Sequence, residues 1–225
     1  MSENVSQSAE IARVEPTSDW GRGSWMQTYT GRQFYPLDAR PEDILPEDIA
    51  HALSMICRYG GHVRQFYSVA EHCLLMSHAV APEHALWALL HDATEAYVGD
   101  MVRPLKHHMP EYREVENRLM VVIGKRFGID GTSMPDAVKE ADNRILLDER
   151  AALLTAPPVA WEQDGLKPLG VKIGPLPWYV ARKQYADRLT FLLTERHLSP
   201  GNSDADCPKC GRFICDDRAT CEGLR

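Results

Sequence analysis

The sequence predicts an all-α protein, and three features carry that prediction. Apolar residues recur at helical spacing in several segments, capping residues or prolines precede these segments, and Gly or Pro follows them. The stretches between the segments are mostly short, which is typical of helices packed around one core. We therefore expect a helical bundle with a short extended segment at its N-terminus and a cysteine-rich tail at its C-terminus.

The composition is that of a globular protein. Hydrophobic residues make up 44% of the 225-residue chain, which is long enough for one sizeable domain. No run of about 18 apolar residues is present, and the first residues lack the basic and apolar stretches of a signal peptide. A formal net charge of -7 disfavours general nucleic-acid binding. We expect a cytosolic protein with a small-molecule substrate and no membrane or nucleic-acid partner.

Three parts of the chain differ in composition. Residues 1–24 are polar and irregular, residues 25–198 carry the helical patterns, and residues 199–225 contain most of the cysteines. Aromatic and turn residues around Gly31 predict a short extended hairpin at the start of the middle part. We expect one main domain, residues 25–198, between two short terminal segments.

Local signals delimit three helices in the first half of this domain. Pro46 begins the first expected helix, and the Gly-Gly pair at 60–61 ends it. Ser68 and Glu71 have the spacing of a capping box and start the second helix. The third helix is expected to run through "AVAPEHALWALLHDATEAYVGD" as far as Gly99.

Three further helices are expected in the second half. The first runs through "EYREVENRLMVVIGKRFG" to Gly128, the next from about Pro135 to a Pro-Pro pair, and the last from about Pro177 to His197. Charged residues of the middle one are expected mostly to face outward. Its expected core residues are Val138, Ala141, Ile145 and Leu153.

Three polar residues interrupt the apolar third helix: His91, Asp92 and Glu95. At about 3.6 residues per turn, His91 and Glu95 fall on one face, and Asp92 lies about 100° round the helix axis. A His-Asp pair alone is a weak signal, because a core histidine beside an exposed polar edge would give the same pattern.

Other segments contribute residues of the same kinds. His72 lies in the first turn of the second helix, Asp142 lies among expected core residues of the fifth, and Asp100 follows the third. Imidazoles and carboxylates together form a mixed nitrogen and oxygen ligand set. Such a set suits Mn²⁺, Co²⁺, Fe²⁺ or Zn²⁺ and leaves coordination positions open, which indicates Lewis-acid catalysis.

The order of these motifs resembles the HD-domain phosphohydrolase superfamily. The segments "SVAEH", "HDATE" and "KEAD" match its H…HD…D signature, and the resemblance runs from about Pro46 to Leu154. With "GDMVRPLK", they are most similar to bacterial 5'-deoxynucleotidases and to phage-borne HD hydrolases, which include small deoxynucleoside triphosphohydrolases. The resemblance implies an HD-domain helical bundle in a bacterial or phage-infected cytoplasm, and a homo-oligomer, because relatives of this type commonly form dimers or larger rings.

The resemblance implies a role for each motif residue. Glu95 matches the carboxylate that orients or deprotonates the attacking water, and Asp100 matches the acidic residue that assists at the leaving group. Mg²⁺ is a candidate for a second ion. The residues that would bind the divalent transition metal are His72, His91, Asp92 and Asp142.

Substrate contacts are implied in the same way. Lys106 and Lys139 match phosphate contacts, and Arg58 roughly matches a substrate-binding arginine. Tyr59 stands where the nucleotidases have tryptophan, and this departure bears on base and sugar selectivity.

Four functions are compatible with these motifs and the resemblance, and one of them is a cyclic-nucleotide phosphodiesterase. The first expectation is an enzyme that hydrolyses a deoxynucleoside monophosphate to the nucleoside and phosphate. One alternative is a triphosphohydrolase that releases tripolyphosphate from a dNTP such as dATP, which would serve phage control of nucleotide pools. Another is an HD module that senses a nucleotide or binds a partner without hydrolysis. The presence of Glu95 and Asp100 beside four ligand residues favours an enzyme.

The C-terminal tail contains a separate cysteine cluster. Its first two cysteines form a Cys-x-x-Cys-Gly knuckle, which is typical of structural zinc sites, although the overall spacing is more compressed than in ordinary zinc ribbons. A redox-active or disulfide-forming tail and a disordered tail are the alternatives. The residues concerned are Cys207, Cys210, Cys215 and Cys221.

Overall fold

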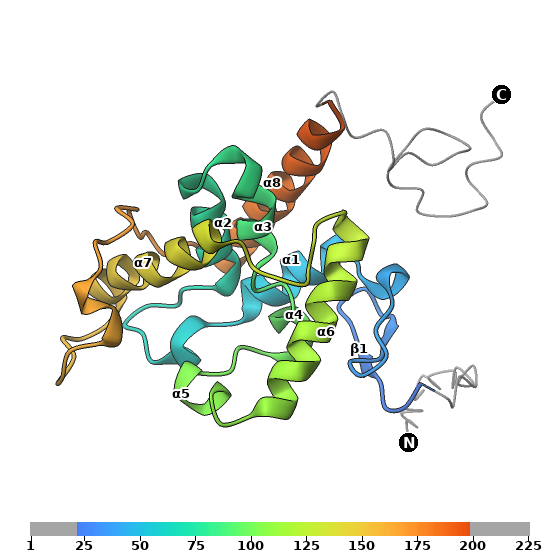
Figure 1. The fold of residues 1–225 in the computed structure, drawn as a ribbon, viewed down its shortest axis with the longest axis horizontal. Coiled ribbons are helices and arrows are strands. Elements are labelled where there is room, and N and C mark those ends of the chain that lie inside the picture. The colour runs from blue at the N-terminus through green and yellow to red at the C-terminus, as the bar shows by residue number, and fades with distance from the viewer. Residues whose placement is uncertain (1–21, 199–225) are drawn as a thin grey trace, which may run out of the picture.

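Helices dominate residues 22–198, the part of the chain that the computed structural model describes (Figure 1). The all-α prediction is therefore confirmed. The predicted cysteine site of the tail and nearly all of the expected irregular segment, residues 1–24, lie outside the described residues. None of the described helices is both long enough and apolar enough to cross a membrane.

The elements follow one another with short connections. Strands β1 (Met26–Gln27) and β2 (Gln33–Phe34) pair antiparallel, with Met26 opposite Phe34, so the predicted hairpin is confirmed. The 3-10 helices are η1 (Pro41–Asp43), η2 (Arg58–Gly61), η3 (Pro82–His84) and η4 (Glu162–Gly165). The α-helices are α1 (Pro46–Met55), α2 (Val69–Ala79), α3 (Ala85–Leu90), α4 (Glu95–Val98), α5 (Arg103–Lys106), α6 (Pro110–Phe127), α7 (Asp136–Leu153) and α8 (Trp178–Leu198).

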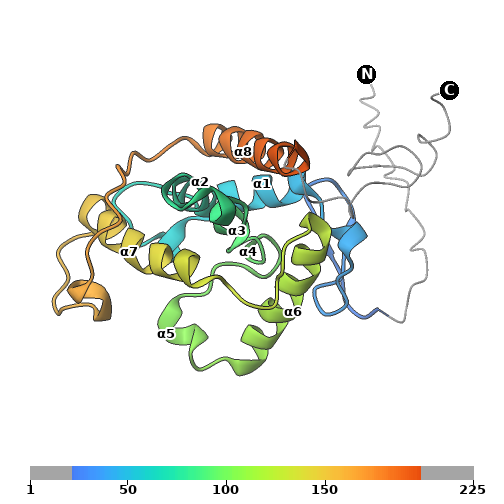
Figure 2. The ribbon, with the colours of Figure 1, turned by 45° about the horizontal axis from the view of Figure 1, so that its top comes forward.

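The core lies where α1, α2, α3 and α8 meet. Figure 2 shows α8 along one side of α1 and α2, with α6 and α7 on the other side of α3 and α4. Leu53, Met76 and Leu89 are fully buried between these helices. Tyr185 of α8 is also fully buried, and its hydroxyl donates to the carbonyl oxygen of Leu89 over 2.9 Å, so its polar atom is satisfied inside the core.

The first helix is shorter than expected. It ends at Met55, because Ile56 and Cys57 are extended and Cys57 pairs with Ser68 in an isolated bridge. Two backbone hydrogen bonds replace those of a continued helix: Arg58 N–H donates to Tyr67 O, and Val69 N–H donates to Ile56 O. Pairing with the segment before α2 therefore overrides the stop signal at the two glycines and points Arg58 inward.

The expected third helix is not continuous. It consists of η3, α3 and α4, and a tight turn over residues 91–94 separates α3 from α4. In this turn Ala93 N–H donates to Leu90 O and Glu95 N–H donates to Asp92 O, a 3-10 pattern. Side chains three residues apart lie on the same side of such a turn, so Asp92 and Glu95 are aligned rather than His91 and Glu95.

The capping box at the start of α2 is confirmed in one half only. Ser68 Oγ accepts a hydrogen bond from Glu71 N–H over 3.2 Å, as an N-cap should. The buried carboxylate of Glu71 accepts instead from Leu176 N–H, 2.9 Å away, in the segment that precedes α8. Burial, as the largest influence, raises the pKa of Glu71 to about 7.

The predicted helices of the second half correspond to α6, α7 and α8. Gly128 ends α6 in the left-handed conformation, and the four expected core residues of α7 are all buried. One charged residue of α7 is an exception to the expectation that its charged residues mostly face outward. Glu149 is fully buried, and its contacts belong to the site described below.

Two glycines bring the loop after α6 back against that helix. A Cβ atom on Gly131 would overlap the carbonyl oxygen of Met120, and one on Gly124 would lie 2.7 Å from the Gly131 backbone nitrogen. We expect Gly131→Ala to lower the free energy of unfolding by about 1–3 kcal/mol, because backbone atoms must separate to admit the methyl group. Urea unfolding followed by circular dichroism measures this.

The matched control is Gly174→Ala. A Cβ atom there would meet no atom within 4 Å, so we expect a change of no more than about 0.5 kcal/mol. Equal unfolding midpoints for the two variants would contradict the close approach of loop and helix.

Candidate metal centre

Four side chains from three elements converge at one point. His72 comes from α2, His91 and Asp92 come from the turn after α3, and Asp142 comes from α7. The Nε2 atoms of the two imidazoles are 3.1 Å apart. Asp92 Oδ2 lies 3.7 Å from His72 Nε2 and 3.2 Å from His91 Nε2. Asp142 Oδ1 lies 3.4 Å and 4.0 Å from the same two atoms.

These distances fit the coordination of a single divalent ion. Ligand atoms at about 2.1 Å from one ion lie roughly 3.0–3.4 Å apart in octahedral or tetrahedral geometry. His72, His91 and Asp142 can hold a metal ion in their present positions, and Asp92 Oδ2 adds a fourth donor within 4.0 Å of both imidazoles. The structure thus brings the four predicted ligands together.

The imidazole tautomers support a cation between the two rings. His91 Nδ1 lies 2.8 Å from the carbonyl oxygen of Ala88, and His72 Nδ1 lies 2.6 Å from Glu149 Oε1. Both Nδ1 atoms therefore act as donors, and both Nε2 atoms present lone pairs to the same point. Two lone pairs 3.1 Å apart repel one another unless a positive charge lies between them.

Glu149 holds His72 from behind and was not predicted from the sequence. Its side chain is fully buried and accepts hydrogen bonds from His72 Nδ1–H (2.6 Å), Tyr59 O–H (2.6 Å), Tyr67 O–H (3.0 Å) and Arg58 Nη2–H (3.2 Å). Burial alone would raise the pKa of this carboxyl group, but Arg58 and His72 lower it to about 2. An ionised carboxylate on the far side of a ligand imidazole fixes the ring and makes it a stronger donor.

A second grouping of donors, Cys73 with His91 and Asp92, does not describe the same site. Cys73 Sγ lies 3.8 Å from His91 Nδ1, the nitrogen that donates to Ala88 O. The thiol is therefore behind the imidazole, and burial raises its pKa, which disfavours the thiolate that binds metals.

The two predicted catalytic carboxylates lie next to this centre. Glu95 is 5% exposed, and its Oε2 atom has no hydrogen-bond partner among the described residues. Burial, followed by the charges of Asp92 and Asp100, raises its pKa well above the usual range. Burial likewise raises the pKa of Asp100. A buried, unpartnered carboxylate beside a cluster of metal ligands is unusual in a purely structural site.

The predicted substrate contacts occupy different environments. Arg58 is buried and donates to Glu149 and Asp92, so its charge is used within the centre. Tyr59 has a φ of 58°, which is rare for a non-glycine residue, and its hydroxyl also donates to Glu149. Lys106 Nζ lies 2.7 Å from Glu116 Oε1, whereas Lys139 is exposed. Of these four residues, Lys139 alone has an exposed charge.

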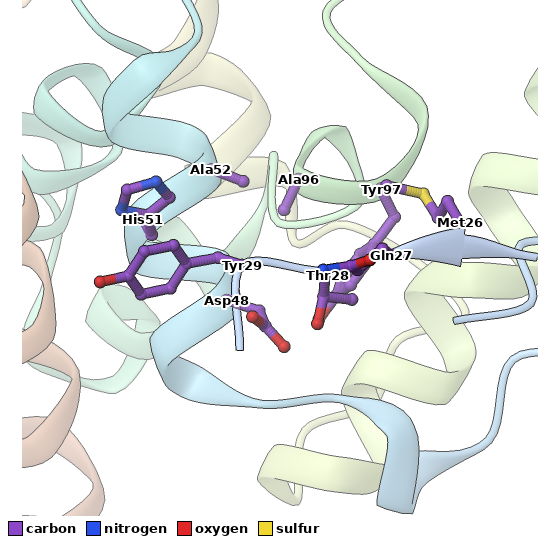
Figure 3. A pocket seen from close by; sticks show the side chains of 9 residues that line it. All are labelled: Met26, Gln27, Thr28, Tyr29, Asp48, His51, Ala52, Ala96 and Tyr97. Carbon is purple, nitrogen blue, oxygen red and sulfur yellow. The ribbon is translucent and has the colours of Figure 1, made fainter. Parts of the chain in front are cut away.

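Another cavity lies apart from the predicted site residues. It has a volume of about 340 Å³ and is formed by the N-terminal hairpin, α1 and α4. Figure 3 shows the ring of Tyr29 beside that of His51, and their centroids are 3.6 Å apart. Ala96 and Tyr97 of α4 line this cavity, while the preceding Glu95 belongs to the metal centre.

Comparison with known proteins identifies the family of this chain. No protein-family model matches the chain. It is 43% identical to the uncharacterized protein YfdR of Escherichia coli K12 over 130 residues, which cover 58% of this chain and 72% of YfdR. The chain belongs to the YfdR family. An uncharacterized protein of Rhodobacter capsulatus is 38% identical over 128 residues, which cover 52% of this chain and 65% of that protein.

In this member of the YfdR family, a sequence signal for Glu149 did exist. Asp142 and Glu149 are seven residues apart, so they lie about two turns apart on one face of α7. Because Asp142 was expected to face the site, the same periodicity predicts that Glu149 faces it too. Tyr67, which completes the group of donors, directly precedes the N-cap of α2 and carries no such signal.

We expect this YfdR-family protein to bind about one divalent transition ion per chain, and His72→Ala to abolish that binding. His72 supplies Nε2 at the centre of the ligand cluster, and among the described residues the candidate metal groups contain no histidine other than His72 and His91. Mass spectrometry of the metal content after dialysis against Mn²⁺, Co²⁺ or Zn²⁺ measures the stoichiometry. His108→Ala, at an exposed position, is the control, and equal loss of metal from both variants would contradict the assignment.

A second expectation concerns Glu149→Gln. The amide keeps the volume of the side chain but removes the charge that faces His72 Nδ1, so we expect metal affinity to fall about 10–100-fold. Competition with a fluorescent chelator measures the affinity. Glu140→Gln on the exposed side of α7 should leave it unchanged. Equal affinities for the two variants would show that the buried carboxylate does not support His72.

Proposed function

We propose that this protein is a divalent-metal-dependent phosphohydrolase of small nucleotides, with the architecture of an HD domain. The first substrate class to consider is the deoxynucleoside monophosphates, which would yield a deoxynucleoside and phosphate. The triphosphohydrolase reaction on a dNTP uses the same ligand set, and the experiment below separates the two.

One observation carries the proposal. Four donor atoms converge: Nε2 of His72, Nε2 of His91 and one carboxylate oxygen each of Asp92 and Asp142. Each of the two oxygens lies within 4.0 Å of both imidazole nitrogens, and the unpartnered carboxylate of Glu95 lies beside this cluster. Motif order in the sequence and convergence in space are independent, since the residues come from separate elements. Both agree with a hydrolytic metal site.

The chain's own residues have distinct parts in such a reaction. A divalent ion at this site would supply Lewis-acid charge and lower the pKa of water. Glu95, whose buried Oε2 atom has no hydrogen-bond partner among the described residues, would accept the proton of the attacking water. Asp100, whose pKa is raised, would donate a proton to the leaving oxygen. Lys139 would contribute positive charge to the phosphate.

Product analysis tests the proposal. The protein is stripped of metal, reloaded with Mn²⁺, Co²⁺, Mg²⁺ or Zn²⁺, and incubated with each dNMP, dNTP and rNTP before chromatography. Phosphate released from dNMPs would support a nucleotidase, and tripolyphosphate from a dNTP would support the triphosphohydrolase. Nucleotide binding with no product under any metal would contradict hydrolysis and favour a nucleotide-sensing module.

We expect Glu95→Gln to lower kcat at least about 100-fold while metal content and nucleotide binding are retained. The amide cannot accept the proton of water but occupies the same volume. Steady-state kinetics and metal analysis on the same preparation measure this. Glu83→Gln, at an exposed position outside the centre, is the matched control. Full activity of the Glu95 variant would remove this residue from the reaction.

A further inference from the structure

A large pocket adjoins the metal centre, and most of the residues that line it lie outside the sequence motifs described above. It has a volume of about 820 Å³ and lies between α5, α7 and η4. Asp142 lines it and also belongs to the ligand cluster, so pocket and centre share one side chain. Its volume falls in the range of small-molecule sites, about 300–1,000 Å³.

The side of this pocket that η4 forms is held by contacts with α7. η4 lies in the long connection between α7 and α8. Asp164 of η4 forms an ion pair with Arg150 of α7 over 2.5 Å and accepts a hydrogen bond from Trp161 N–H over 2.9 Å. The Arg150 guanidinium lies 4.9 Å from the centre of the Trp161 ring. Arg144 donates to the carbonyl oxygens of Lys167 and Pro168.

Positive charge gathers at the end of the pocket next to the metal centre. Arg103 Nη2 lies 3.3 Å from Asp142 Oδ2, while Asp142 Oδ1 faces the imidazoles. Arg103 Nη1 donates to Asn143 Oδ1 over 3.2 Å, and the side chain is 44% exposed and lines the pocket. Lys139, one turn before Asp142 on α7, lines the same end. An anionic group near the metal ligands would thus meet two cations.

The other end of the pocket has the opposite character. The carboxylate of Glu162 and the amide of Gln163 line it, together with the apolar side chain of Leu166. A carboxylate accepts hydrogen bonds from amino and hydroxyl groups and repels further phosphates. The apolar side chain offers a surface for a planar ring.

We propose that this pocket holds the nucleoside of a nucleoside monophosphate whose base carries an exocyclic amine. The phosphate lies at the end formed by Arg103 and Lys139, and the base lies against η4, where Glu162 accepts a hydrogen bond from its amine. η4 is thereby the specificity element, and its acidic residues disfavour triphosphates. This inference rests on the proposed function and names its substrate class.

Equilibrium binding tests the assignment without turnover. The Glu95→Gln protein, loaded with Mn²⁺, is titrated with dAMP, dTMP and dATP by calorimetry. The same titrations are made with double variants that also carry Glu162→Ala or Glu162→Lys. dTMP lacks an exocyclic amine, so we expect Glu162→Ala to weaken dAMP about tenfold and dTMP less than about threefold. Glu162→Lys should raise the affinity for dATP relative to dAMP at least about tenfold.

Exposed Glu83 provides matched controls for both substitutions, Glu83→Ala and Glu83→Lys. If the Glu162 variants shift the three affinities no more than these controls, the pocket assignment is overturned, even where product analysis establishes dNMP hydrolysis. If dAMP binding depends on Glu162 but no nucleotide is hydrolysed with any metal, the pocket assignment is supported and the proposed hydrolysis fails.

Discussion

The imidazole of His72 and the carboxylate of Glu149 lie 2.6 Å apart in a fully buried position, and the geometry of the centre depends on this contact. It fixes the proton on Nδ1 and aims Nε2 at the other ligands. A carboxylate without compensation would be costly at that depth. Four donors from Arg58, Tyr59, Tyr67 and His72 supply the compensation, so the segment before α2 is tied to α7.

This buried network also accounts for the unusual backbone near Arg58. Tyr59 adopts a positive φ of 58°, and its hydroxyl donates to Glu149 over 2.6 Å. Left-handed conformations of non-glycine residues cost free energy and persist where surrounding contacts determine them. The early end of α1, the extended residues after it and the inward position of Arg58 all place donors around one carboxylate.

The connection between α7 and α8 combines two functions in this fold. Its ion pair with Arg150 and its backbone contacts with Arg144 hold η4 and the residues after it against the middle and C-terminal part of that helix. Its end is held by Glu71, the residue before His72, through Leu176 N–H. The same connection therefore packs apolar side chains against the core and forms one wall of the pocket that Asp142 lines.

The sequence by itself determined the helices with strong periodicity and the candidate ligand residues. α6, α7 and α8 begin and end close to their predicted positions, because Gly128 and the prolines act locally. The residues His72, His91, Asp92 and Asp142 stood out because their order in the chain resembles the H…HD…D signature. These signals need no knowledge of how distant segments pack.

Only the tertiary structure decided where those helices break and what stands behind the ligands. The turn at residues 91–94 aligns Asp92 with Glu95, and the shortened α1 follows from pairing with the segment before α2. Tyr67 became part of the site through its contact with Glu149, 82 residues away in the sequence. Local pattern cannot show such contacts, because their free energy depends on burial that exists only after the chain has folded.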